Sequence, residues 1–173
     1  MEQLYFSDEI QRKLSGIYRS GLTMIEAPAG YGKSTAVRWA MKKLPADQVR
    51  WFTAVSFQQD TSLDWFIRQI GSLDASAGNA LRELGFLNRS NVSDAADILS
   101  RLSISEPCYL ILDNFQLVGD NWPLPLLQAL ADRNQDGLHV VLISQNFKKL
   151  RAVFESSSGV TSLNSRDFLL GKR

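Results

Sequence analysis

The sequence predicts a three-layer α/β domain, in which helices cover both faces of a parallel β-sheet. Two features of the chain support this prediction. Short apolar runs without polar alternation recur along it, as in strands that are buried on both faces. Between these runs, apolar residues return every three or four positions, which is the period of a helix that packs on one side. Strands and helices that alternate in this way imply right-handed crossovers between parallel strands.

The predicted strands share a high content of apolar, β-branched and aromatic residues. The first of them ends in Pro28 and the glycines that follow it, which interrupt a strand. The expected strands cover residues 22–27, 49–55, 108–113 and 138–144, with a weaker fifth strand within 160–170.

The predicted helices are apolar stripes that follow capping residues. Ahead of the first strand, residues 10–17 carry one apolar face behind the expected N-cap Ser7. Ser93 is the expected cap of a later helix, and Pro123 lies in the first turn of another, where proline is tolerated. Trp122, in the loop before Pro123, is expected to be exposed and available for contacts. Further apolar stripes begin at residues 36, 63, 95 and 127.

The composition of the chain excludes several classes of protein. A length of 173 residues is typical of one domain. The 19 basic and 18 acidic residues give a net charge of +1, so the chain lacks the excess of basic residues that is typical of a nucleic-acid-binding protein. A single cysteine excludes an internal disulfide framework and a cysteine-cluster zinc site. The chain lacks an apolar run near the ~18 residues of a membrane span and a signal-peptide pattern. We therefore expect a cytoplasmic protein without a membrane partner.

The most informative motif lies between the first predicted strand and the helical stripe after it. Residues 27–34 read Ala-Pro-Ala-Gly-Tyr-Gly-Lys-Ser, a Walker A pattern in which Ala27 replaces the usual leading glycine. A loop that wraps an anion turns its backbone N–H groups inward, and Gly30 and Gly32 can adopt the positive φ angles that this requires. The helix that follows directs its positive N-terminal end at the phosphates.

Side chains at the end of this loop complete the expected phosphate chemistry. Lys33 neutralises the β- and γ-phosphates, the Ser34 hydroxyl ligates Mg²⁺, and Thr35 reaches the α-phosphate. The alternative is a glycine turn before a helix whose lysine is merely solvated, but the strand–loop–helix context favours nucleotide binding. The predicted nucleotide-binding residues are Ala29, Gly30, Tyr31, Gly32, Lys33, Ser34 and Thr35.

A second acidic ligand is expected at the end of another buried strand. Asp113 ends the run 109–113 and would hold Mg²⁺ through water, whereas the alternative is a carboxylate that caps the next loop. Asn114 stands where hydrolysing relatives of this architecture carry a second acid, and an amide is a poor base. Gln145, after the fourth strand, is expected beside the γ-phosphate or as a solvated strand end. The predicted catalytic residues are Lys33, Asp113, Asn114 and Gln145, and the predicted metal ligands are Ser34 and Asp113.

Four segments together resemble one family: APAGYGKST at 27–35, RWFTAV at 50–55, YLILDNFQLV at 109–118 and VVLISQN at 140–146. Over residues 4–170 the chain resembles the nucleotide-binding domain of the signal-transduction ATPases with numerous domains (STAND), in particular the MalT-like, large ATP-binding LuxR-type transcription activators. The resemblance implies a P-loop NTPase core with five parallel strands in the order 2-3-1-4-5. It also implies an ATP/ADP switch in which an inducer favours an ATP-bound, self-associating form, and a contribution of residues 4–10 to adenine binding.

The chain departs from the family at two positions. The family usually has Asp-Asp where this chain has Asp113-Asn114, and an arginine where it has Gln145. The resemblance therefore implies adenine-nucleotide binding with Mg²⁺ and slow or absent hydrolysis. Residues 1–173 are expected to form one nucleotide-binding domain, the N-terminal fragment of a larger regulator whose remaining domains are its partners, and to make no direct DNA contact because a helix-turn-helix is not visible. The alternatives are an autonomous small P-loop enzyme (a kinase or ATPase) and a catalytically dead interaction scaffold.

Overall fold

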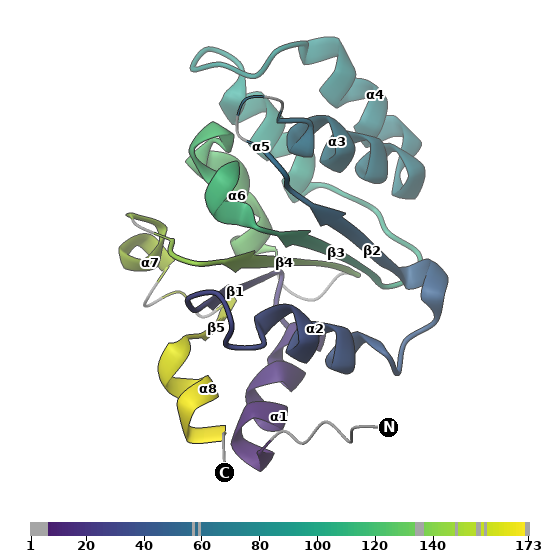
Figure 1. The fold of residues 1–173 in the computed structure, drawn as a ribbon. Coiled ribbons are helices and arrows are strands. Elements are labelled where there is room, and N and C mark those ends of the chain that lie inside the picture. Colours follow the sequence, from purple (N-terminus) through teal and green to yellow (C-terminus); the bar gives the residue numbers. More distant parts are fainter. Residues whose placement is uncertain are drawn as a thin grey trace.

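The computed structural model describes residues 7–56, 58, 60–133, 137–147, 149–154, 157 and 159–171. It has the predicted three-layer α/β architecture, with a five-stranded, all-parallel sheet (Figure 1). The strands occupy the predicted segments, including the weaker fifth one. They are β1 (Leu22–Glu26), β2 (Val49–Thr53), β3 (Cys108–Asp113), β4 (Leu138–Ser144) and β5 (Val160–Leu163).

The order of the strands differs from the prediction. The sheet runs β2-β3-β4-β1-β5, so β4 lies between β3 and β1 and the expected order 2-3-1-4-5 is wrong for this pair. Val140 of β4 is in register with Leu110 on one side and with Leu22 on the other. Apolar runs indicate that a strand is buried but not which strands are its neighbours, so the order is decided by tertiary packing. As a result, the end of β4 lies beside both β1, which leads into the Walker A loop, and β3, which ends in Asp113.

Helices cover both faces of the sheet. Figure 1 shows α1, α2 and α8 on one side and α3 to α6 on the other. Ser7 caps α1 as predicted, since its Oγ accepts from the Ile10 N–H at 3.2 Å. The predicted cap Ser93 is wrong because α5 begins at Val92, with Asn91 at the N-cap position. The helices are α1 (Asp8–Leu14), α2 (Lys33–Met41), α3 (Ser62–Leu73), α4 (Ala75–Leu84), α5 (Val92–Ser100), α6 (Leu124–Asp132), α7 (Lys149–Phe154) and α8 (Ser165–Gly171).

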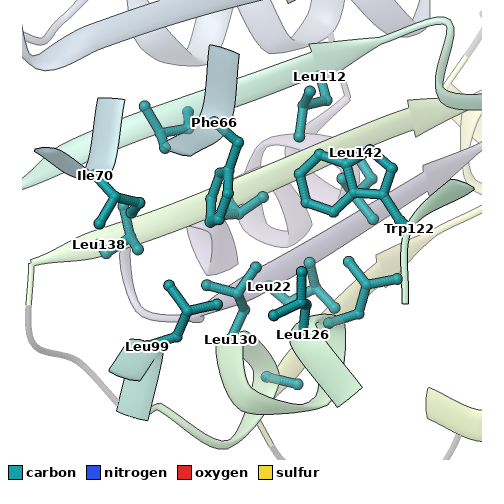
Figure 2. Packing of buried hydrophobic residues seen from close by; sticks show 14 of the residues in the cluster. Leu22, Phe66, Ile70, Leu99, Leu112, Trp122, Leu126, Leu130, Leu138 and Leu142 are labelled. Atoms are coloured by element: carbon teal, nitrogen blue, oxygen red, sulfur yellow. The ribbon is translucent and has the colours of Figure 1, made fainter. Parts of the chain in front are cut away.

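The larger part of the core lies between the sheet and α3, α5 and α6 (Figure 2). Trp122 belongs to this core with 4% of its surface exposed, so the expectation of an exposed side chain is wrong. Its ring packs against Phe66 and Phe115, and its Nε1 donates to Ser62 Oγ at 2.9 Å. Position in a loop does not set the direction of a side chain, and a satisfied indole N–H is readily buried.

A smaller core lies on the opposite face, between the sheet and α1, α2 and α8. Its largest fully buried side chains include Leu14, Ile17 and Ile25. This packing holds the N-terminal end of α2 against the carboxyl end of β1. Within the described part of the chain, every helix is too short or too polar to cross a membrane.

Candidate functional site

The glycine-rich loop joins β1 to α2 at the carboxyl end of the parallel sheet, where such folds bind ligands. Gly30 and Gly32 have φ angles of 89° and 80°, which confirms the predicted left-handed conformation. A Cβ atom built on either residue meets nothing within 4 Å. Backbone conformation, and not lack of space, is therefore the reason for glycine at both positions.

The base of the loop is packed while its top is open. Ala27, which replaces the usual glycine, is 1% exposed, and its N–H donates to the Ser144 carbonyl at 3.2 Å. Ala29 and Gly30 are exposed, and Tyr31 is half-buried against the smaller core. The loop thus presents an accessible backbone surface on a buried foundation. Thr35 is exposed in the first turn of α2.

Lys33 folds back over the loop in this structure. Its ammonium group donates to the carbonyl of Ala27 and, at 3.2 Å, to that of Pro28. Burial lowers the pKa of Lys33, and the negative charge of Asp113 partly opposes this effect. A phosphate would offer this cation stronger acceptors than two backbone carbonyls.

Ser34 and Asp113 are 79 residues apart in the sequence and adjacent in space. The Ser34 hydroxyl donates to Asp113 Oδ2 at 2.8 Å. A hydroxyl and a carboxylate are oxygen donors of the kind that Mg²⁺ prefers, and this ion keeps water or phosphate oxygens in its other positions. Among the described residues, no group of three or more His, Cys, Asp or Glu side chains could hold a metal by itself. The donor set therefore fits a Mg²⁺ ion that is shared with a nucleotide.

Asn114 has a structural part in this site. Its φ angle of 58° is left-handed, a conformation that asparagine tolerates better than most residues. Its N–H donates to Asp113 Oδ1 at 2.9 Å, and its Nδ2 donates to the Ala54 carbonyl at 3.2 Å. The side-chain amide is thus bound to the end of the neighbouring strand β2.

Gln145 lies at the end of β4 and is exposed. Its N–H donates at 3.0 Å to Oε1 of Gln116, which lies in the short helical turn Phe115–Leu117 after β3. Gln116 therefore connects the turn after Asp113 to the end of β4. The sequence analysis missed this residue, because a polar side chain in a loop carries no local signal of its partner.

A second missed residue, Glu26, ends β1 directly before the loop and is 7% exposed. Its Oε2 accepts from the Phe147 N–H at 2.7 Å, and its Oε1 forms an ion pair with Arg151. The chain after β4 is thereby attached to the Walker A strand as well. The available signal was one charged residue at the end of an otherwise uncharged strand.

The predicted adenine-binding segment is described only in part. Residues 4–6 lie outside the described residues. Ser7 caps α1, and Ile10 is 3% exposed within the smaller core. Ile10 is therefore occupied by packing in this structure.

The chain is similar to several known proteins. The family model described as "AAA domain" matches residues 17–154. The HTH-type transcriptional regulators MalT of Klebsiella pneumoniae and Serratia proteamaculans are each 23% identical to the chain over 98% of its length. The chain spans 18% of these relatives' own length.

A solved structure, that of a STAND protein with a tetratricopeptide repeat sensor from Pyrococcus horikoshii, has a similar fold. Its TM-score is 0.53 at 22% identity, over 94% of this chain and 24% of that one. The resemblance to MalT-like STAND P-loop domains that the motifs indicated is thus confirmed.

Proposed function

We propose that this chain, which belongs to the AAA domain family, is an ATP/ADP-binding regulatory switch domain of a LuxR-type transcription activator. The hydrogen bond between Ser34 and Asp113 is the observation that carries the proposal, because it brings together the two expected Mg²⁺ ligands from the start of α2 and the end of β3. The similarity to regulators named MalT supports the regulatory role.

Each residue of the site has a distinct part in nucleotide binding. The backbone N–H groups of the loop and the first turn of α2 surround the phosphates, with Gly30 and Gly32 shaping the loop. Lys33 exchanges the carbonyls of Ala27 and Pro28 for β- and γ-phosphate oxygens. Mg²⁺, when bound, neutralises phosphate charge, and Ser34 and Asp113 hold it.

Adenine nucleotides should stabilise the domain against heat, whereas GTP should have little effect. Ligand that binds only the folded chain stabilises it by RT ln(1 + [L]/Kd), about 2.7 kcal/mol at a hundredfold excess over Kd. Thermal unfolding in the presence of ATP, ADP and GTP at equal concentrations tests this expectation. Equal shifts with ATP and GTP would contradict the adenine preference.

The dependence of ATP affinity on Mg²⁺ should become weaker when the Ser34 hydroxyl is removed. In Ser34→Ala, Mg²⁺ should improve ATP affinity about tenfold less than in the wild-type chain. Loss of one residue that supports a bound metal ion typically lowers metal affinity by about this factor. Ser34→Thr is the matched control, because threonine supplies the same hydroxyl at this motif position. Calorimetric titration with ATP, with and without Mg²⁺, measures both variants. An unchanged Mg²⁺ effect in Ser34→Ala would show that Ser34 is not a ligand.

Hydrolysis should be very slow. The amide of Asn114 is engaged by the Ala54 carbonyl and is a poor base, and Gln145 brings no positive charge to the γ-phosphate. A positioned arginine can accelerate phosphoryl transfer by roughly 10³-fold or more. Gln145→Arg should therefore increase single-turnover ATP hydrolysis, while Gln145→Leu should not.

Two results would separate this proposal from its alternatives. Rapid hydrolysis by the wild-type chain, lost in Lys33→Ala, would favour an autonomous P-loop enzyme. ATP binding without hydrolysis in either the wild-type chain or Gln145→Arg would favour a nucleotide-binding scaffold.

The partners follow from the same proposal. They are adenine nucleotide, the remaining domains of the regulator, and further copies of the ATP-bound chain. DNA contacts would come from other parts of a regulator of this type and not from this domain, and a cytoplasmic location agrees with such a role.

A further inference from the structure

Glu26 places a buried charge directly before the glycine-rich loop. It ends β1 one residue before Ala27, whose carbonyl accepts the ammonium group of Lys33. Successive side chains of a strand point to opposite faces. Glu26 therefore lies on the face of Met24, which belongs to the larger part of the core, and not on the face that Ile25 shares with α2. A carboxylate that is only 7% exposed thus lies behind the phosphate site.

Both oxygens of this carboxylate are engaged by the chain that follows β4. Oε2 accepts from the Phe147 N–H at 2.7 Å, and Oε1 forms the ion pair with Arg151 on α7. The pair is asymmetric, because the side chain of Glu26 is 9% exposed and that of Arg151 is 67% exposed. Figure 1 accordingly shows α7 at the edge of the molecule. Arg151 can therefore be replaced without disturbing the core, whereas Glu26 is part of its boundary.

Side chains from three places in the fold hold residues 145–147, the segment that follows β4. Backbone N–H groups outside helices and sheets need other acceptors, and each N–H of this segment donates to a side-chain oxygen. The orientation of Gln145 at the carboxyl edge of the sheet therefore depends in part on Glu26. The three donor–acceptor pairs are the N–H of Gln145 with Gln116 at 3.0 Å, that of Asn146 with Ser144 at 3.3 Å and that of Phe147 with Glu26 at 2.7 Å.

The ion pair also affects the charge that a bound nucleotide meets. The Cα atoms of Glu26 and Ala27 are about 3.8 Å apart, well inside the ~8 Å over which salt screens charges at physiological ionic strength. A carboxylate without a partner so close to the loop would repel phosphates, and it would repel ATP more strongly than ADP because ATP carries more negative charge. Arg151 neutralises that carboxylate from outside the loop.

We propose that Glu26 and Arg151 are a positioning pair that sets the preference of the site for ATP over ADP. Glu26 holds the segment from which Gln145 faces the γ-phosphate. Arg151 removes the negative charge that would otherwise disfavour the nucleotide with more phosphates. This inference rests on the proposed function, and it adds to that function two residues that lie outside the Walker motifs.

Replacing the hydrogen-bond acceptor tests the positioning role. Glu26→Leu keeps a side chain of similar size but accepts no hydrogen bond, so the Phe147 N–H loses its partner. The ratio of the ADP Kd to the ATP Kd should fall about tenfold, which is the scale of one hydrogen bond. Glu26→Gln keeps an oxygen acceptor, and its ratio should be at or above the wild-type value. Calorimetric titration with each nucleotide in Mg²⁺ measures both Kd values.

Removing only the compensating charge tests the electrostatic role. In Arg151→Gln the carboxylate of Glu26 keeps its charge and loses its partner, and the same ratio should fall about threefold. The double variant Glu26→Gln with Arg151→Gln has neither charge, so its ratio should return to the wild-type value. Arg68→Gln is the matched control, because it removes an exposed arginine from α3 and should leave the ratio unchanged.

The ratio of the two Kd values separates a specific effect from a loss of folded protein, because partial unfolding weakens both apparent affinities by the same factor. An unchanged ratio in Glu26→Leu or in Arg151→Gln, or a double variant whose ratio stays as low as that of Arg151→Gln, would overturn the proposal. If Glu26→Leu does not fold, the Arg151 variants still decide the question, since that side chain is exposed. A wild-type chain that does not bind ATP would instead contradict the proposed function, and this inference with it.

Discussion

Lys33→Ala should abolish or severely weaken nucleotide binding while the fold persists. The ammonium group of Lys33 is the cation at the end of the glycine-rich loop, and its present acceptors are the Ala27 and Pro28 carbonyls. Charge-assisted hydrogen bonds to phosphate are about twice as strong as neutral ones, so two lost bonds should weaken binding by about 3 kcal/mol or more. A loss of that size is at least a hundredfold in Kd.

Calorimetric titration with ATP and Mg²⁺ measures this loss. Lys42→Ala is the matched control, since Lys42 is the C-cap residue of the same helix, is exposed, and carries the same charge. Its affinity should equal that of the wild-type chain. If Lys33→Ala bound ATP with unchanged affinity, the assignment of the phosphate site would be wrong.

Gly78→Ala should destabilise the domain by about 3 kcal/mol, because α3 and α4 cross in close contact at this residue. A Cβ atom on Gly78 would lie 2.4 Å from the Cα of Gly71, which is backbone and cannot move aside without separating the two helices. This cost exceeds the gain of about 1 kcal/mol that alanine brings to a helix interior.

Gly71→Ala is the control from the other side of the same contact. Its Cβ would meet the end of the Arg82 side chain at 3.2 Å and the Gly78 Cα at 3.6 Å, and a flexible side chain can yield. Urea unfolding should therefore show Gly71→Ala at or slightly above the stability of the wild-type chain. Equal destabilisation of both variants would contradict the expectation that only Gly78 lacks room for a Cβ atom at this helix crossing.

The helices and strands that were predicted best are those with the clearest local pattern of apolar residues. Each expected strand is present, and β3 and β4 have the expected bounds, because continuous apolar runs belong to strands buried on both faces. Helices α4, α7 and α8 were not predicted. α7 is short, and in α4 small residues such as Gly78 replace the large apolar side chains that a stripe requires. α8 begins within the segment 160–170, for which only a strand was expected.

Contacts between residues that are far apart in the sequence could not be predicted from the spacing of apolar residues. Strand order depends on which runs become neighbours, and β4 lies between β3 and β1 for reasons of packing that periodicity does not record. The burial of Trp122 depends likewise on Phe66 and Phe115, from distant elements.

The site was predicted to the extent that its chemistry is local. The Walker A loop is contiguous, and Gly30 and Gly32 have the expected positive φ angles. The contact of Ser34 with Asp113 follows from two motifs whose joint presence implies proximity. Gln116 and Glu26 were missed because their roles are hydrogen bonds to Gln145 and Phe147, which only the fold brings near.

The most direct test of the account is a calorimetric titration of the wild-type chain with ATP, in Mg²⁺ and again after its chelation. The account predicts saturable binding of one nucleotide per chain, with an affinity that falls when Mg²⁺ is removed, since Ser34 and Asp113 then lose the ion that links them to the phosphates. The absence of saturable binding at millimolar ATP, with and without Mg²⁺, would contradict it.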